Sequence, residues 1–370
     1  MKKQYFLMAI TATMFAACSQ TEIIDEVADN STPKAIGFTT YAEGQTRAEN
    51  SGADYTWHLE SHHKTFNVWA YKNVSDTKVF NGDVVTHDGS IWKYTDTRYW
   101  DKAADKYEFY AAAPAVDKSS NNMQWVLNTN TNAQYDDYFT LQDYSIVGNN
   151  LNATVFSSYT QSFATLANDL DLMIADKKPV TTFYNDVDLK FTHILSRLNI
   201  TVKKKDITNA VNLVSLEVYN LNNIGDFDES KVTDPSAGTN ARWATDKTNF
   251  ISYAYTGGEE VTEDAQYAIQ ALVLPQDAAA ENIYLDGRDI TLATSKPFIK
   301  LVYTITSGSN VETFAVYYNL SKVFNDAATK LAFNEGWQNT LNITIKPTAI
   351  TFDANVATWD FNVGNNPVIE

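Results

Sequence analysis

Short runs in which apolar and polar residues alternate recur along this chain of 370 residues, and turn-forming residues separate them about every 8–12 positions. Alternation with a period of two is typical of half-buried strands, as over residues 66–70, 189–195 and 341–345. Asp88-Gly89 between two such runs predicts a hairpin, and Ser307-Gly308 predicts another. The abundant Tyr, Phe, Thr and Val residues suit pleated sheets. We therefore expect an all-β protein with a sandwich in each half.

The first residues form an export signal. Lys2 and Lys3 precede a largely apolar stretch from Tyr5 to Ala17, which is too short to span a bilayer as a helix. Small residues then precede Cys18, the only cysteine in the chain, which can form no internal disulfide. We expect a signal peptide over residues 1–17, cleavage between Ala17 and Cys18, and a lipid such as palmitate on Cys18. Plain secretion and a chance cysteine are the alternatives.

The rest of the chain divides into a tether and two domains. Residues 18–33 are polar and acidic and predict a flexible tether. A first strand follows over residues 34–42, with Ile36 and Phe38 on one face, and then a polar loop that exposes Arg47 to proteolysis.

We expect one sandwich over residues 34–180 and a second over residues 181–370, with a hinge at residues 176–179. Two stretches, residues 117–165 and 225–260, show weak periodicity and predict long loops. Around Ser196-Arg197 the apolar positions change from odd to even numbers, which predicts a β-bulge.

The end of the chain carries more strand-like sequence than one domain edge needs. Two blocks of alternating apolar residues follow each other with a one-residue change of phase. The first block holds Ile350, Phe352, Ala354 and Val356, and the second holds Trp359, Phe361 and Val363. We expect the first block to pair within its own domain and the second to be able to pair elsewhere, although an ordinary last strand is an alternative for both.

Composition and motifs argue against several classes of function. A net charge of −17 and a pI near 4.7 oppose binding to nucleic acid, whose phosphates need clustered Lys and Arg. Nothing selects a nucleophile, a phosphate loop or a catalytic carboxylate pair, so we expect neither an enzyme nor a cofactor. His58, His62 and His63 with Glu60 lack the pattern of a zinc site, and we expect exposed loop residues there. We expect His193, on an apolar face, to pack rather than to act as a base.

A group of aromatic residues has two interpretations. It comprises Trp92, Tyr94, Tyr99, Trp100 and Tyr107. Such rings could form a platform for stacking sugars, but their strand spacing favours packing in a core.

Several short pieces occur in a fixed order over most of the chain. They are the lipoprotein signal, Ile36-Gly37-Phe38 before Thr46-Arg47-Ala48, Tyr99-Trp100 before residues 107–110 and Pro114, residues 191–198, residues 272–276, Gly336-Trp337 before residues 341–343, and Ile350-Thr351-Phe352 with Trp359. Together they resemble the fimbrillin-like proteins, the lipoprotein pilins that build type V fimbriae in Gram-negative anaerobes of the gut and mouth.

The resemblance implies two tandem transthyretin-like β-sandwiches and assembly by donor-strand exchange. A lipoprotein precursor would reach the outer membrane through the lipid on Cys18. An arginine-specific protease would then cut between Arg47 and Ala48 and remove the strand that holds Ile36 and Phe38. A C-terminal segment within residues 350–363 of the next subunit would replace it; its candidate residues are Ile350, Phe352, Ala354, Val356, Trp359, Phe361 and Val363.

The expected function is therefore that of a structural subunit of cell-surface fimbriae that contributes to adhesion. Its partners would be related pilins and ligands on host or bacterial surfaces, and not nucleic acid. Two alternatives remain: a monomeric outer-membrane lipoprotein that binds glycans, and the lipid-retaining anchor or the tip of a fimbria.

Overall fold

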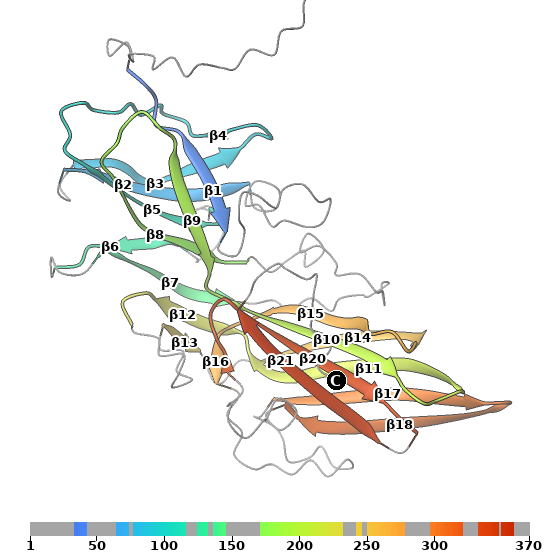
Figure 1. Cartoon of the computed structure of the whole chain (residues 1–370). Helices are drawn as coiled ribbons and strands as arrows, with labels where there is room; N and C mark the ends of the chain where they lie inside the picture. Colours follow the sequence, from blue (N-terminus) through green and yellow to red (C-terminus); the bar gives the residue numbers. More distant parts are fainter. Residues whose placement is uncertain are drawn as a thin grey trace, which may run out of the picture. The chain divides into compact units, whose positions relative to one another are not determined.

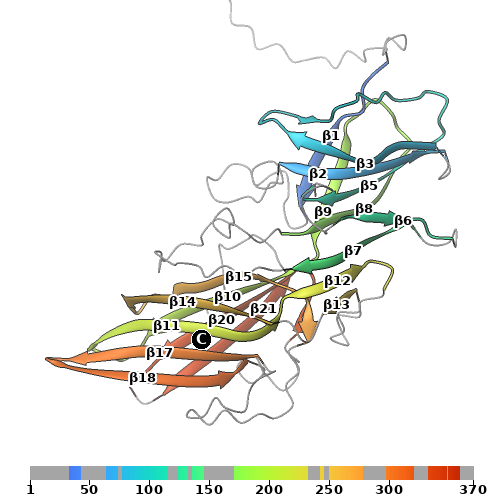
Figure 2. The ribbon, with the colours of Figure 1, turned by 180° about the vertical axis from the view of Figure 1, so that it is seen from behind.

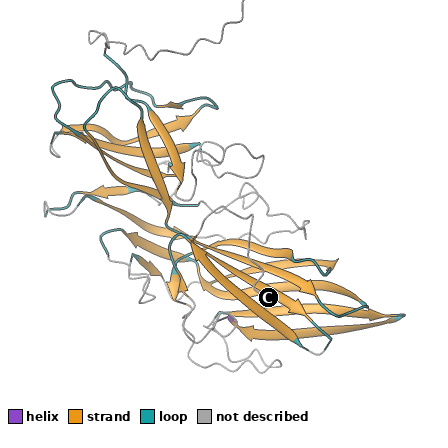
Figure 3. Cartoon of the chain, in the orientation of Figure 1, coloured by secondary structure: helices purple, strands orange, loops and turns teal. Residues whose placement is uncertain are grey.

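A computed structural model of the chain describes residues 33–42, 64–73, 77–115, 124–131, 136–145, 171–231, 242–245, 250–277, 297–320, 332–347 and 349–358. The chain divides into two units, Met1–Lys34 and Ala35–Glu370, and every strand of the described ranges lies in the second. Regular structure in the described ranges is nearly all strand, which confirms the predicted all-β class (Figure 3). No helix in these ranges is long and apolar enough to cross a membrane.

Seven strands form the largest sheet, in the order β1-β9-β8-β5-β2-β3-β4 (Figure 1). They are β1 (Phe38–Ala42), β2 (Thr65–Lys72), β3 (Thr77–His87), β4 (Trp92–Lys93), β5 (Tyr107–Ala113), β8 (Met173–Val180) and β9 (Val187–His193). Six successive residues of the interior strand β2 are buried, from Phe66 to Tyr71, so both of its faces are covered. A strand covered on both faces loses the alternating pattern of a half-buried strand.

The predicted hairpin at Asp88-Gly89 is confirmed. Strands β3 and β4 pair antiparallel, and His87 lies opposite Trp92. The Asp88 carboxylate accepts hydrogen bonds from the backbone N–H groups of Ser90 and Ile91, which closes the turn. Gly89 has a φ of 100°, a backbone conformation that favours glycine.

Two four-stranded sheets form the C-terminal sandwich (Figure 2). One holds β15 (Gln266–Val273), β10 (Ser196–Lys204), β20 (Trp337–Ile345) and β21 (Ile350–Thr358); the other holds β14 (Phe250–Glu260), β11 (Ala210–Asn222), β17 (Phe298–Ser307) and β18 (Asn310–Asn319). The sheets meet at one edge, where the rings of Tyr318 and Phe352 lie 4.4 Å apart. Ser307 pairs with Asn310 across Gly308, which confirms the second predicted hairpin.

Two smaller sheets correct the expectation of long loops. One contains β13 (Trp243–Thr245), β12 (Ile224–Asp228), β7 (Tyr138–Ser145) and β6 (Val126–Asn128), and the other pairs β16 (Gln276–Asp277) with β19 (Ala332–Phe333). Residues 117–165 therefore include two strands, and residues 225–260 include β13, β14 and most of β12. Their apolar residues pair with strands far away in the sequence, so local periodicity did not mark them.

The expected hinge at residues 176–179 is wrong, because these residues lie inside β8 and Lys178 and Pro179 pair with β5. The bulge expected at Ser196-Arg197 is also wrong. The chain instead leaves the seven-stranded sheet after His193 and enters the sheet of β10 at Ser196. The apolar positions change from odd to even numbers where the chain crosses from one sheet to the other, because the two sheets turn different sides of the chain toward the core. The observed register shift in β10 comes later, between Ile200 and Thr201.

Strand β9 begins after the expected domain boundary at residues 180 and 181, yet it pairs with β8 and β1. The division into two tandem domains stays a prediction.

Candidate functional site

Strand β1 forms one end of the seven-stranded sheet, and its partner among the described residues, β9, is distant in the sequence. It runs parallel to β9, with Phe38 opposite Val187 and Ala42 opposite Phe191 (Figure 1). The Thr39 hydroxyl donates to Asp188 Oδ1 at 3.0 Å, across a sequence separation of 149 residues. Because no neighbouring strand in the sequence forms this pairing, β1 is held to the sheet much as a bound peptide would be.

The segment just before β1 is bonded on both sides. On one side, the Val187 N–H donates to the Gly37 carbonyl at 2.8 Å. On the other side, the Ile36 N–H donates to the Arg98 carbonyl at 2.9 Å, and the Tyr94 hydroxyl donates to the Ile36 carbonyl at 2.7 Å. We call the residues that contact Ile36 and Phe38 the first-strand site; its members are Phe66, Phe80, Tyr94, Arg98, Phe109 and Val187.

The two predicted face residues of β1 are buried in the core, as their alternation indicated. Ile36 is 1% exposed and Phe38 is 5% exposed. The Phe38 ring makes edge-on contacts with four other rings, at centroid distances of 5.7 Å to Phe66, 5.7 Å to Phe80, 5.9 Å to Tyr94 and 6.1 Å to Phe109. Each such pair contributes about 0.5–1.5 kcal/mol beyond the area it buries, so Phe38 is a main anchor of β1.

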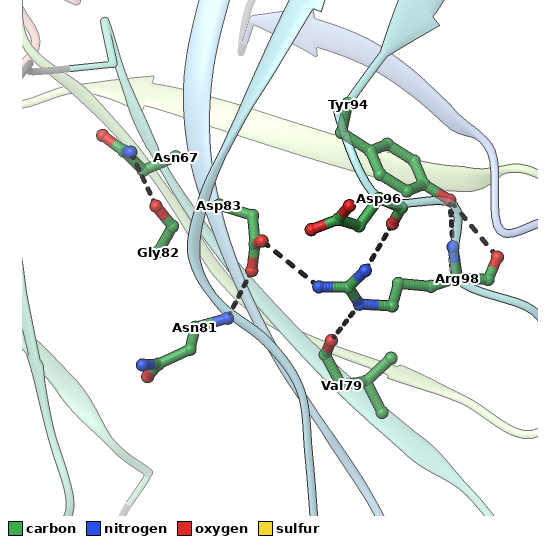
Figure 4. Close-up of polar contacts among 8 residues, drawn as sticks. All are labelled: Asn67, Val79, Asn81, Gly82, Asp83, Tyr94, Asp96 and Arg98. Carbon is green, nitrogen blue, oxygen red and sulfur yellow. Dashed lines mark hydrogen bonds and ion pairs between the residues drawn. The ribbon is translucent and has the colours of Figure 1, made fainter.

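Arg98 ties the segment that accepts Ile36 to strand β3 (Figure 4). Its Nε donates to the Val79 carbonyl at 3.1 Å, its Nη1 donates to the Asp96 carbonyl, and its Nη2 lies 3.5 Å from Asp83 Oδ1. The guanidinium also lies over the Phe80 ring, 5.8 Å from its centroid. A planar guanidinium offers several donors in a fixed geometry, and here it holds a loop against a strand.

A bulge in β3 places the Asp83 carboxylate. Val68 pairs with Asp83, but Trp69 pairs with Asn81, so Gly82 is the extra residue, with a φ of 77°. The Asn67 side chain donates to the Gly82 carbonyl and the Asn81 N–H donates to Asp83 Oδ2, which fix the bulge and the carboxylate (Figure 4).

Tyr94 keeps its proton as a donor to the Ile36 carbonyl, just before β1. Burial raises the pKa of its hydroxyl above the ordinary value, although the Arg98 N–H and the guanidinium lower it in part. The hydroxyl also lies 3.3 Å from the Arg98 carbonyl and accepts from the Arg98 N–H at 3.4 Å. Tyr94 therefore presents a neutral hydroxyl whose place depends on the backbone of Arg98.

A second cluster of charges lies apart from the first-strand site. Arg242 is 3.3 Å from Glu229 and 3.1 Å from Glu335, and the Phe139 N–H donates to Glu229. Burial raises the pKa of Glu229 to about 8, and its hydrogen bond to Asp176 adds to the rise. Burial raises the pKa of Glu335 to about 7, although Arg242 opposes the shift at both acids. One cation cannot balance these acids in a buried site, so protons are held there.

Several predicted residues lie outside the described ranges: Ala17, Cys18, Arg47, Ala48, Trp359, Phe361 and Val363, and also His58, Glu60, His62 and His63. The first donor block lies in β21, which pairs antiparallel with β20 from Ile350 opposite Ile345 to Thr358 opposite Trp337. Ile350 and Phe352 are partly buried against the core. The backbone of Ala354 and Val356 belongs to the same strand.

The aromatic group packs rather than forming a platform. Trp92, Trp100 and Tyr107 are buried and Tyr94 packs against the core, whereas Tyr99 is 54% exposed. A sugar platform would need several exposed rings on one face, so the packing interpretation is confirmed for these four residues.

His193 is buried, as expected, and it also has a partner that the sequence did not indicate. Its Nδ1 lies 2.9 Å from Asp171 Oδ2, and both side chains are almost fully covered. Asp171 precedes β8 and His193 ends β9, and the pairing of Met173 with His193 brings them together.

Sequence reasoning missed the acceptor and donor that hold Ile36. Tyr94 was identified only as an aromatic residue, and nothing distinguished Arg98 from other exposed cations. Tyr94 is 58 residues from Ile36 in the sequence, so only the fold brings them together.

Solved structures of fimbrial proteins are similar to this chain. A fimbrial protein from Bacteroides vulgatus shares 17% identity with a TM-score of 0.51, and the match covers 88% of this chain and 99% of that one. The tip fimbrial protein Mfa3 from Porphyromonas gingivalis, with a C-terminal truncation, shares 10% identity with a TM-score of 0.36, covering 81% and 96% of the two chains. No curated protein matches the sequence. The sequence profile described as fimbrillin-like matches residues 46–359, and the chain therefore belongs to the fimbrillin-like family.

Proposed function

We propose that this chain is a structural subunit of cell-surface fimbriae that polymerises by exchange of its first strand. The observation that carries the proposal is the first-strand site itself. Ile36 and Phe38 are buried, the segment just before β1 is bonded on both sides, and β1 ends at Ala42, five residues before Arg47 in the sequence. The family match begins at residue 46, after this strand, so the matched region leaves β1 out.

Removal of β1 would leave a specific deficit. The Val187 N–H would lose its bond to Gly37, the Arg98 carbonyl and the Tyr94 hydroxyl would lose their bonds to Ile36, and the space of Ile36 and Phe38 would open to water. Burying such side chains stabilises a protein by about 1.5–3 kcal/mol each, and unpaired buried polar groups cost about 1–3 kcal/mol each. An extended segment with alternating apolar side chains corrects both losses at once.

Residues 359–363 are the better donor in this proposal. Residues 350–358 already pair with β20 along their whole length, so their transfer to another subunit would break that ladder. Trp359, Phe361 and Val363 have the same two-residue spacing as Ile36 and Phe38 and follow that ladder in the sequence. Strand β21 would then stay paired with β20 of its own chain and support the donor segment that follows it; it holds Ile350, Phe352, Ala354 and Val356.

Export as a lipoprotein completes the proposal. A lipid on Cys18, after cleavage at Ala17, would hold the precursor at the outer membrane until the cut between Arg47 and Ala48 releases it. The mature subunit would be found in cell-surface fimbriae, where it would contact related pilins and contribute to adhesion to host or bacterial surfaces. A subunit that kept its lipid would act as an anchor.

The test replaces the cleavage residue. In the Arg47→Gln variant we expect an uncut chain that begins at Cys18 and stays monomeric, because β1 still fills its site. Lys34→Gln is the matched control, since it removes a cation on the other side of β1 and should leave cutting and assembly unchanged. N-terminal sequencing and detergent-resistant multimers on gels measure both steps. Assembly of uncut Arg47→Gln protein, or normal assembly after deletion of residues 359–370, would overturn the proposal.

A further inference from the structure

The two sides of the first-strand site differ in how they are held. On one side is β9, which is itself paired with β8. On the other side is the segment from Tyr94 to Tyr99, which contributes the isolated bridge of Tyr99 with Ala35, the bonds to Ile36 and the contact of the Tyr94 ring with Phe38, but no strand ladder. We call this segment the loop wall. A wall without a strand ladder needs another support when β1 is absent.

The side chain of Arg98 supplies that support, and none of its partners belongs to β1. It bonds to Val79 and Asp83 of β3 and to Asp96 within the loop wall (Figure 4). Its cation also lies over the Phe80 ring of β3. These contacts would persist after β1 is removed, whereas the bond between the Ile36 N–H and the Arg98 carbonyl would be lost.

The polar groups of the loop wall recognise main chain, while the Tyr94 ring contacts the Phe38 side chain. The Arg98 carbonyl accepts from a backbone N–H, and the Tyr94 hydroxyl donates to the carbonyl of the same residue, Ile36. The Tyr94 hydroxyl is also bonded to the backbone of Arg98. The Arg98 side chain, which holds this backbone, therefore places both the Arg98 carbonyl and the Tyr94 hydroxyl. Recognition of this kind accepts any extended strand whose apolar side chains fit the core.

We propose that Arg98 is a positioning residue that keeps the loop wall in its binding shape while the first-strand site is empty, ready for the strand of a second copy of this chain or a related subunit. This inference rests on the proposed strand exchange. Preformed groups reduce the ordering that binding requires, and a site that is competent only part of the time binds more weakly by that fraction.

The test uses the full chain cut after Arg47, and the probe is a fluorescent peptide that copies residues 33–42 and displaces the bound strand. A second peptide replaces the amide between Ala35 and Ile36 with an ester, which removes the Ile36 N–H without adding bulk. Loss of one hydrogen bond to a placed acceptor weakens binding by about tenfold, so the parent protein should prefer the amide by about that factor. Capture of the amide peptide by Arg98→Gln should be about tenfold slower, because its loop wall is seldom in place.

The amide-to-ester ratio separates positioning from general stability. In Arg98→Gln we expect the ratio to fall to near one, because the carbonyl no longer stands in place, while Lys93→Gln, an exposed neighbour paired with Asp88, should behave as the parent. If Arg98→Gln does not fold, Arg98→Lys, which has fewer donors, provides the same comparison with an intermediate ratio expected.

A tenfold preference that persists in the Arg98 variant, or capture as fast as in Lys93→Gln, would overturn the inference. The peptide copies the native strand, so its binding is measured whether or not the protein polymerises. If instead the proposed function were wrong, the protein would not assemble on cells although the purified parent protein still preferred the amide peptide to the ester peptide.

Discussion

Replacing Phe38 by Ala should weaken the attachment of β1 more than any other single truncation in this strand. The ring is 5% exposed and meets four aromatic neighbours. Phe→Ala in a packed core costs about 3–5 kcal/mol. Because β1 lies at the end of its sheet and its neighbours can relax, we expect the lower value, about 3 kcal/mol.

Urea denaturation of the uncut protein, followed by tryptophan fluorescence, measures this loss. Trp92 contacts Phe66, a direct neighbour of Phe38, so it reports on this part of the core. Val84→Ala is the matched control, because Val84 is 45% exposed on β3 and its truncation should change stability by less than about 0.5 kcal/mol.

The same loss should appear as a binding defect after cutting. About 3 kcal/mol corresponds to a weakening of the bound strand by about a hundredfold, so a Phe38→Ala fragment should dissociate far more readily than the parent fragment. If Phe38→Ala were no less stable than Val84→Ala, and its fragment stayed bound as the parent fragment does, β1 would not be anchored by this ring.

Three further predictions follow from the polar contacts. Tyr94→Phe keeps the ring but removes the bond to Ile36, so the free energy of unfolding should fall by about 1 kcal/mol in urea titrations; an unchanged value would contradict the bond. In the folded state Glu229 and Glu335 keep their protons up to about pH 7–8, whereas in the unfolded chain both acids lose them above the ordinary pKa near 4.5. Unfolding therefore releases protons, and the contribution of these two acids to stability falls as the pH rises toward 7–8. Urea titrations at pH 5, 6 and 7 should show a slope that Glu335→Gln reduces by at most about 1.4 kcal/mol per pH unit, and an equal slope in that variant would refute the pKa shift. Asp171→Asn removes the negative charge of the carboxylate beside His193 and should cost about 2 kcal/mol in the same assay; an unchanged free energy of unfolding would contradict a stabilising pair.

Local patterns predicted the parts of the fold that depend on neighbours in the sequence. Asp88-Gly89 and Ser307-Gly308 form their hairpins because a turn needs only a few adjacent residues. Ile36 and Phe38 are buried together because side chains two apart share a face of a strand.

Patterns failed where the fold joins distant segments. The parallel pairing of β1 with β9 has no local turn to signal it, so Val187 could not be linked to Gly37. The change of parity at Ser196 had two physical explanations, a bulge or a change of sheet, and only the strand order distinguishes them. The first-strand site was therefore predicted from one side only: the strand was identified, but the Arg98 loop wall that holds it was not.

The most direct test of the account is the N-terminal sequence and mass of the protein taken from the native cell surface, before and after heating in detergent. The account predicts a chain that begins at Ala48, has lost Ile36 and Phe38, and runs as multimers that resist detergent until heated. A lipidated chain that begins at Cys18 and runs as a monomer would contradict it.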